Sequence, residues 1–222
     1  MTDLVTFNPQ EIEHAAHAIS AVTHAVPGLY QALYETIGLF WTDPIKRKRR
    51  EKNLKAEFEM AEEMIKGKKR LDDISATLAK EVLEPAMEED REELQKIWAA
   101  LLARLMTDEL SVLRSEWIDI IKGLEPIDVG IFEFLKTFKN TTKQGDKGFF
   151  IKCFSEKFKN EFPQTKYEES DFWLSFQSLV NKSLLFPVQT IARDKDGTWS
   201  PAYIITPLGN KIVEITSPPT SE

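Results

Sequence analysis

Three histidines and one cysteine are the residues of this chain best suited to metal or nucleophilic chemistry. His14, His17 and His24 are all of the histidines, and they share one face of a helix expected over residues 8–25. Two histidines three residues apart suit a metal, but no H-E-x-x-H pattern accompanies them, so a polar stripe is the simpler interpretation. We therefore expect no metal and no cofactor.

Cys153 is the only cysteine, so it forms no disulfide within the chain and no cysteine-based zinc site. The phenylalanines on either side of it predict a buried thiol rather than a nucleophile. The acidic residues between 88 and 93 begin a helix, where carboxylates favour the helix dipole and stay solvated. The sequence also lacks glycine-rich phosphate loops. It predicts a protein that is not an enzyme, with no evident small-molecule substrate.

Charge is distributed very unevenly along the chain. The net charge is −7, yet residues 46–70 carry 11 bases and 5 acids, while residues 71–93 carry 2 bases and 9 acids. The two blocks nearly cancel, so the total conceals a dipolar helical region. The densest part of the basic block is a run that consists of Lys46, Arg47, Lys48, Arg49, Arg50 and Lys52.

The basic run, Lys46–Lys52, has three interpretations. It is a solvated face partly neutralised by Glu51 and the acidic block, or a contact for anionic lipid, or a contact for nucleic acid. Lipid is attractive because the preceding segment, 25–41, is apolar and aromatic and ends in tryptophan, as interfacial helices do. The same segment also suits the core of a helical bundle.

Helices are expected throughout the first two-thirds of the chain. Proline at the first helical position predicts starts near Pro9 and Pro44, with a second helix over 29–41 between them. Asp72 or Asp73 is expected to cap the next helix, which Pro85 breaks or kinks. Asp90 is expected to cap the helix with the strongest apolar stripe, which contains Leu94, Trp98, Leu101 and Leu105.

The last third changes character. A helix is expected after Pro126 and another over 172–185, followed by strands over 186–192 and 198–205 and a closing helix that begins at Thr206-Pro207. This order is typical of a winged helix-turn-helix. We therefore predict a mainly α fold, in which an N-terminal helical region is followed by a winged-helix-like module with a small β-hairpin. The expected bounds are 1–123, 124–216 and a flexible tail over 217–222.

Three segments carry a resemblance to a known family. The first, Leu83 to Met106, contains the pattern L-x-x-x-W-A-x-L-L-A after an acidic lead-in. The second, Trp117 to Leu135, contains L-x-P-x-D-x-x-I-F-x-x-L, and a late segment contains T-P-x-G. In this order they resemble the bacterial Abi-alpha family, named for abortive infection. The motif core consists of Leu94, Trp98, Leu101, Leu102 and Asp128.

The resemblance implies a bacterial protein of defence against phage, in which infected cells die or stop growing. It implies no catalytic mechanism. The residues point the same way, so our first hypothesis is a non-enzymatic defence protein that acts through a protein partner or a homo-oligomer. The alternatives are a membrane-surface effector that uses residues 29–52, and a DNA-binding regulator.

The winged-helix-like module is a poor match for DNA. Its candidate recognition helix begins with acids and has one base, Lys182, and its wing adds only Arg193 and Lys195, each beside an aspartate. Because DNA affinity depends on neutralising phosphates, nucleic acid is a disfavoured partner.

The sequence also bears on where the protein is found. It has neither an apolar run of 18 residues nor a signal-peptide pattern at its start. We therefore expect a cytoplasmic protein, which in the lipid alternative is peripheral at the inner membrane.

Overall fold

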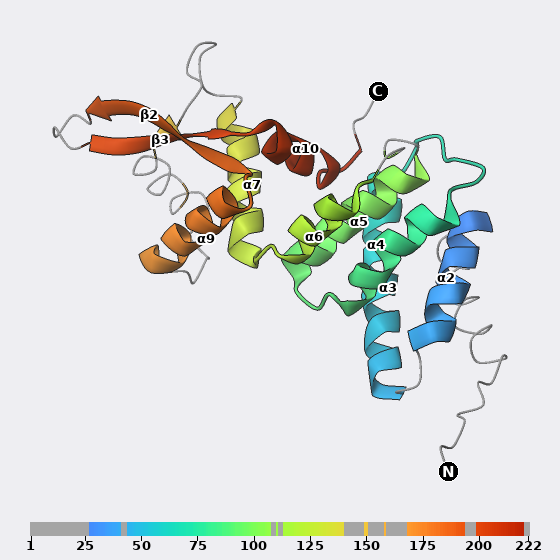
Figure 1. Cartoon of the computed structure of the whole chain (residues 1–222). Coiled ribbons are helices and arrows are strands. Elements are labelled where there is room, and N and C mark those ends of the chain that lie inside the picture. Colours follow the sequence, from blue (N-terminus) through green and yellow to red (C-terminus); the bar gives the residue numbers. More distant parts are fainter. Residues whose placement is uncertain are drawn as a thin grey trace. The chain divides into compact units, whose positions relative to one another are not determined.

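The computed structural model describes residues 27–40, 44–107, 110, 113–139, 149–150, 158, 168–193 and 199–219. The chain divides into two compact units, Met1–Lys122 with Ile215–Glu222, and Gly123–Glu214. The described residues are mostly helical, with one small antiparallel sheet, which confirms the mainly α fold class (Figure 1). The expected first helix with its histidines lies outside the described residues, as do Cys153 and Lys195.

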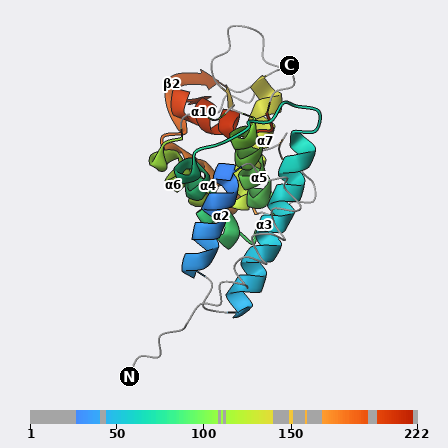
Figure 2. The same ribbon diagram turned by 90° about the vertical axis from the view of Figure 1, so that its right-hand side faces the viewer.

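Helix α4 is the hub of the first unit. It packs against α2, α3, α5 and α6, and α3 also packs along α5. Figure 2 shows the long helix α3 over its whole length. The bounds of these helices are α2 Pro27–Phe40, α3 Pro44–Met64, α4 Ala76–Glu88, α5 Glu92–Met106 and α6 Ser115–Lys122.

Helix α5 lies in the interior because it is apolar on nearly every side. Its motif residues Leu94, Trp98, Leu101 and Leu102 expose 1% of their surface or less, and every residue from Ile97 to Met106 is buried. The facing helix α3 and the residue just after its end contribute an apolar stripe whose members are all buried: Leu54, Phe58, Ala61 and Ile65.

The predicted caps at Asp73 and Asp90 are wrong. Helix α4 begins after Ser75, whose hydroxyl accepts a backbone N–H of the first turn. The Asp73 carboxylate instead accepts the backbone N–H of Gly28, at 2.9 Å, in the first turn of α2. Helix α5 begins after Arg91, which provides no side-chain cap. In both cases the aspartate makes contacts that depend on tertiary packing, which the local sequence does not predict.

The second unit combines helices with a three-stranded sheet. Strand β3 is central and pairs antiparallel with both neighbours, with Leu185 of β2 opposite Ile205 of β3. Aromatic rings fill the space beside the sheet, and the ring centroids of Phe172 and Phe176 lie 5.0 Å apart. The bounds are α7 Pro126–Lys139, β1 Phe149–Phe150, α9 Glu169–Asn181, β2 Leu185–Arg193, β3 Trp199–Ile205 and α10 Pro207–Ile215.

The T-P-x-G motif at 206–209 joins the sheet to α10. The Thr206 hydroxyl accepts the Gly209 N–H at 2.9 Å and so caps the helix, while Pro207 occupies the first helical position. A Cβ on Gly209 would lie 2.2 Å from the carbonyl oxygen of Leu184, so only glycine allows this approach.

The end of the chain returns to the first unit. The buried Arg104 of α5 donates from Nε to the Ser217 carbonyl at 2.8 Å and from Nη2 to the Pro218 carbonyl at 3.1 Å. The described residues 215–219 therefore group with the first unit, whereas the expected bounds are 124–216 for the second unit and 217–222 for a tail. The reason is long-range pairing to a buried guanidinium, which composition does not reveal.

The described helices were compared in length and apolarity with what a bilayer requires of a spanning helix. None of them combines the length and the apolarity that a transmembrane span requires.

Candidate functional site

The basic run lies at the start of α3, and its two central arginines are neutralised. Arg49 donates to Glu88 at 2.9 Å and lies 3.3 Å from Asp90. Arg50 is buried and donates from Nε to Glu88 at 2.6 Å. Beside them, Asn53 donates to the Met87 carbonyl at 3.1 Å. The acidic end of α4 is therefore the counter-charge of the basic run.

The lysines of the run remain at the surface. Lys46, Lys48 and Lys52 are exposed, and Lys48 and Lys52 form no ion pair with the described residues. The side chain of Arg47 lies outside the described part of the structure. The run thus separates into arginines that hold α3 to α4 and lysines that face water.

A buried carboxyl group lies one turn further along α3. Glu57 is 0% exposed, and neither of its oxygens has a hydrogen-bond partner among the described residues. Burial raises the pKa of Glu57 well above its usual value, and the negative charge of Glu89 raises it further. The raised pKa favours the neutral form of Glu57, which avoids the large cost of a buried, unpaired charge.

Glu89, just after α4, is in the opposite state. Burial acts to raise the pKa of Glu89, but hydrogen bonds from Arg91 and its charge outweigh burial, so the pKa lies below the usual value. Arg91 donates from Nε at 2.8 Å, from Nη2 at 3.0 Å and from its backbone N–H at 3.0 Å. Two neighbouring carboxyl groups with pKa shifts in opposite directions therefore lie between α3 and the α4–α5 junction.

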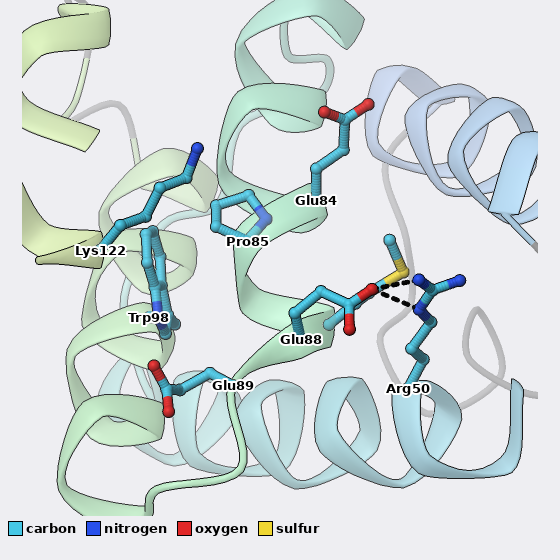
Figure 3. Close-up of a pocket in the computed structure, with 8 residues that line it drawn as sticks. Arg50, Glu84, Pro85, Glu88, Glu89, Trp98 and Lys122 are labelled. Carbon is cyan, nitrogen blue, oxygen red and sulfur yellow. Dashed lines mark hydrogen bonds and ion pairs between the residues drawn. The ribbon is translucent and has the colours of Figure 1, made fainter. Parts of the chain in front are cut away.

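A pocket of about 390 Å³ opens next to Glu89 within the first unit. Figure 3 shows Trp98 and Pro85 on its wall, with the Lys122 side chain on one side and the Arg50–Glu88 pair on the other. The residues that line it are Arg50, Glu84, Pro85, Met87, Glu88, Glu89, Trp98 and Lys122.

One polar atom of the pocket wall has unmet hydrogen-bonding capacity. Trp98 is 1% exposed, and its indole Nε1–H has no acceptor among the described residues. Most buried donors in proteins are paired, so an orphan donor in a pocket wall needs an explanation. Helix α4 continues through Pro85, which removes one backbone N–H from the helix at the same wall.

Asp128 of the L-x-P-x-D pattern holds the second unit together. It is 1% exposed, accepts the backbone N–H of Glu125 at 2.9 Å, and also accepts the hydroxyl of the buried Ser175 on α9. Burial raises the pKa of Asp128, while the hydrogen bonds from Ser175 and Glu125 act in the opposite direction. The motif aspartate caps α7 and ties it to α9, which is a structural role.

Helix α9 exposes two large apolar side chains on its outer face. Phe172, Phe176 and Leu179 point inward and are buried, whereas Trp173 and Leu174 expose 42% and 66% of their surface. The remaining exposed positions of the helix include Ser170, Gln177 and Asn181, which share the same side at helical spacing.

Two of the residues expected to contact nucleic acid, Lys182 and Arg193, lie on this unit. Lys182 follows α9 and donates to the hydroxyl of Ser178, four residues earlier. Arg193 is the last residue of β2, and its side chain lies outside the described part of the structure.

Comparison with models of known families shows which family the chain belongs to. The family model described as abortive infection alpha matches residues 46–194, which is more than half of the chain. The chain belongs to the abortive infection alpha family. This confirms the resemblance seen in the sequence, and membership implies a part in abortive-infection defence. Neither the curated proteins nor the solved structures include a match.

The family match covers both the pocket of the first unit and helix α9 of the second. It begins at Lys46, the first residue of the basic run, and includes every residue of the pocket and the whole of α9. Glu57, which lies near the pocket without lining it, was not predicted from the sequence. The available signal was its position between Leu54 and Phe58, where a polar residue interrupts an apolar stripe.

Proposed function

We propose that this abortive infection alpha protein acts by binding another protein through the outer face of α9, without catalysis. The partner surface that fits this face is an apolar patch bordered by lysine or arginine. The proposal rests on one observation, the exposure of Trp173 and Leu174 side by side on α9. Exposed large apolar residues that adjoin one another mark interaction sites, and tryptophan is enriched among residues that dominate binding energy.

The order of elements supports a winged-helix assignment for the second unit. Helix α7, strand β1, helix α9, the β2–β3 hairpin and helix α10 follow one another, and β1 pairs with β3. In a winged helix, α9 would occupy the place of the recognition helix. The fold serves DNA readers and protein-interaction modules alike, so the residues on α9 have to decide between them.

Charge on α9 favours a protein over DNA. Glu168 and Asp171 form a capping box at its start, so acids stand where a DNA reader would meet phosphates. Lys182 at its other end is engaged with Ser178. The same acids complement a basic border on a protein partner, which gives the encounter its specificity.

The pocket argues for binding rather than catalysis. Glu57 and Glu89 have opposite pKa shifts, which is the pattern of an acid–base pair. Glu57, however, is fully buried and does not line the pocket, so a bound substrate would not reach it. A general acid has to lie within hydrogen-bond reach of its substrate.

Part of the apolar face that the lipid alternative needs is buried. Leu29, Ala32 and Leu33 of α2 are 0% exposed, and α2 packs against α4. The basic run retains outward lysines, but interfacial helices bind through buried apolar area as well as charge. Flotation with vesicles of anionic lipid tests this alternative, and co-flotation at low salt would favour it over a protein partner.

A phage assay with matched surface variants tests the proposed face. Leu174→Asp places a charge at the centre of the face, and Tyr34→Asp is the control because Tyr34 on α2 is 43% exposed. We expect both variants to melt like the parent protein. Leu174→Asp should lose protection against phage by about tenfold or more in plaque counts, as loss of a central apolar contact predicts. Tyr34→Asp should protect fully.

The same variants separate the possible partners. Cross-linking in infected cells should capture a protein with the parent chain and not with Leu174→Asp. Protection that survives Leu174→Asp would contradict the proposal. Dimers that dissociate in Leu174→Asp would instead assign the face to a second copy, and a gel shift at about 50 mM salt would assign it to DNA.

A further inference from the structure

We propose that the pocket beside Trp98 binds a small, uncharged molecule that has a planar apolar body and one hydrogen-bond acceptor. The site belongs to the first unit and is independent of the α9 face. It therefore goes beyond the proposed protein contact and gives this defence protein a small-molecule site.

The pocket is built like a ligand site. Four helices contribute to it, with Arg50 from α3, Pro85 from α4, Trp98 from α5 and Lys122 from α6. Its volume of about 390 Å³ falls at the small end of the range that holds organic ligands. Its lining includes two apolar side chains of the interior, Met87 and Trp98, which are 2% and 1% exposed. An indole wall beside a proline ring suits a flat ligand.

The orphan indole N–H defines what the ligand must carry. Trp98 Nε1–H lacks an acceptor among the described residues, although Trp98 lines the pocket. A ligand with a carbonyl-type oxygen would pair this donor and remove the cost of its burial. The nitrogen exposes almost no surface, so a rim side chain has to move as the ligand enters. The Lys122 side chain is 50% exposed and lies beside Trp98 in Figure 3, so it is suited to that movement.

The charges of the pocket are already matched, which argues for a neutral ligand. Glu88 pairs with Arg49 and Arg50, and Glu89 pairs with Arg91. The rim groups are paired more loosely, Glu84 with Lys80 at 3.7 Å and Lys122 with Asp119 at 3.9 Å. A charged ligand would have to disrupt one of these pairs, whereas a neutral ligand leaves all of them in place.

Benzamide is the probe for this site, because it is flat, neutral and carries one amide oxygen. The full chain is titrated at millimolar concentrations with benzamide, and in parallel with toluene, benzoate and benzylamine. The readout is the set of indole N–H signals from the five tryptophans in a nitrogen–proton correlation spectrum. We expect benzamide to shift the Trp98 signal alone. Toluene lacks the acceptor, and the two ions carry charge, so each should bind at least about tenfold more weakly.

Two variants with matched controls make the test specific. Trp98→Phe keeps a ring but removes the donor together with its N–H signal, so benzamide binding to this variant is measured by calorimetry. It should be weakened by about tenfold, the usual effect of one lost hydrogen bond. Trp173→Phe makes the same change outside the pocket and should bind normally. Glu84→Trp adds bulk at the partly exposed rim without touching the core and should abolish binding. Glu81→Trp, on the same helix but outside the pocket, should not.

Several results would overturn the proposal. Benzamide could leave the Trp98 signal unmoved, or bind no better than toluene or benzylamine. Unchanged benzamide affinity in Trp98→Phe would show that the indole donor is not used. If Trp98→Phe does not fold, Glu84→Trp decides, because normal binding in that variant would exclude the pocket.

Discussion

Glu57 on α3 carries its carboxyl group in the field of the ionised Glu89, and the two residues have pKa shifts of opposite sign. The difference arises from their partners. Glu89 is held by three hydrogen bonds from Arg91, whereas Glu57 is fully buried without a partner among the described residues. The interior of the first unit thus contains a group whose protonation is coupled to folding.

Stability of the first unit should fall as pH rises, because of Glu57. The folded state holds this proton more tightly than the unfolded chain, whose pKa is near 4.5. The contribution of Glu57 is therefore complete below about pH 4.5 and is lost as the pH rises through the raised pKa, at about 1.4 kcal/mol per pKa unit. Glu89 acts oppositely, since its lowered pKa costs stability only as the pH falls below 4.5.

Glu57→Gln isolates this effect. The variant should be more stable than the parent by about 1–3 kcal/mol near pH 8 and no more stable near pH 4.5, because the amide never has to ionise. Urea unfolding across that pH range is the measurement. Glu59→Gln is the control, since the Glu59 side chain is 58% exposed on the same helix. If the stability difference between the parent and Glu57→Gln were the same near pH 8 as near pH 4.5, Glu57 would not be buried in its protonated form.

The Arg50–Glu88 pair should contribute more than its neighbour. The Arg50 side chain is 10% exposed, against 46% for Arg49, and both meet Glu88. Arg50→Met should cost about 1–3 kcal/mol, because Glu88 loses its buried partner, and Arg49→Met should cost less than about 1 kcal/mol. Thermal unfolding at low and high salt measures both, and the Arg49 pair alone should weaken with salt. Equal losses of stability in the two variants would show that burial does not strengthen the Arg50–Glu88 ion pair.

The sequence predicted helices wherever an apolar stripe and a capping proline agreed. Pro44 begins α3, Pro126 begins α7, and the stripe through Trp98 is the buried face of α5. These signals are local, because both proline geometry and helical periodicity act within a few residues. The cap predicted at Asp73 was wrong because the Asp73 carboxylate accepts a hydrogen bond from Gly28, which is distant in the sequence.

The candidate site was predicted only in part. The sequence indicated the basic run and the acidic block, and one interpretation was that the acids partly neutralise the bases. Arg49 and Arg50 do pair with residues of the acidic block. It interpreted Glu89 as a solvated acid, whereas Glu89 is 8% exposed. Pockets and buried carboxyls depend on how helices cross, and side-chain periodicity gives the face of each helix but not its neighbour.

Asp128 should be required for the stability of the second unit. Asp128→Ala removes the acceptor for the Glu125 N–H and leaves the buried Ser175 hydroxyl without its partner, so we expect a loss of about 2–3 kcal/mol. Ser175→Ala removes only one of the two bonds and should cost about 1 kcal/mol. Denaturant unfolding followed by aromatic circular dichroism measures both. A larger loss in Ser175→Ala than in Asp128→Ala would exclude the capping role.

Arg104 should hold the end of the chain to the first unit. Its guanidinium is 4% exposed and donates to the Ser217 and Pro218 carbonyls. Arg104→Met should therefore cost about 2–3 kcal/mol, since bonds to a buried charge are strong, and Lys96→Met at an exposed site of α5 should cost less than about 0.5 kcal/mol.

Truncation after Thr216 tests the same contact from the other side. It removes two carbonyl acceptors of the buried guanidinium, so it should cost about as much as Arg104→Met. The two changes should not add, because each removes the same contact, and the truncation should have little further effect in the Arg104→Met background. Chemical unfolding of the four proteins gives the coupling energy. Additive losses would show that the segment after Thr216 stabilises the unit independently of Arg104.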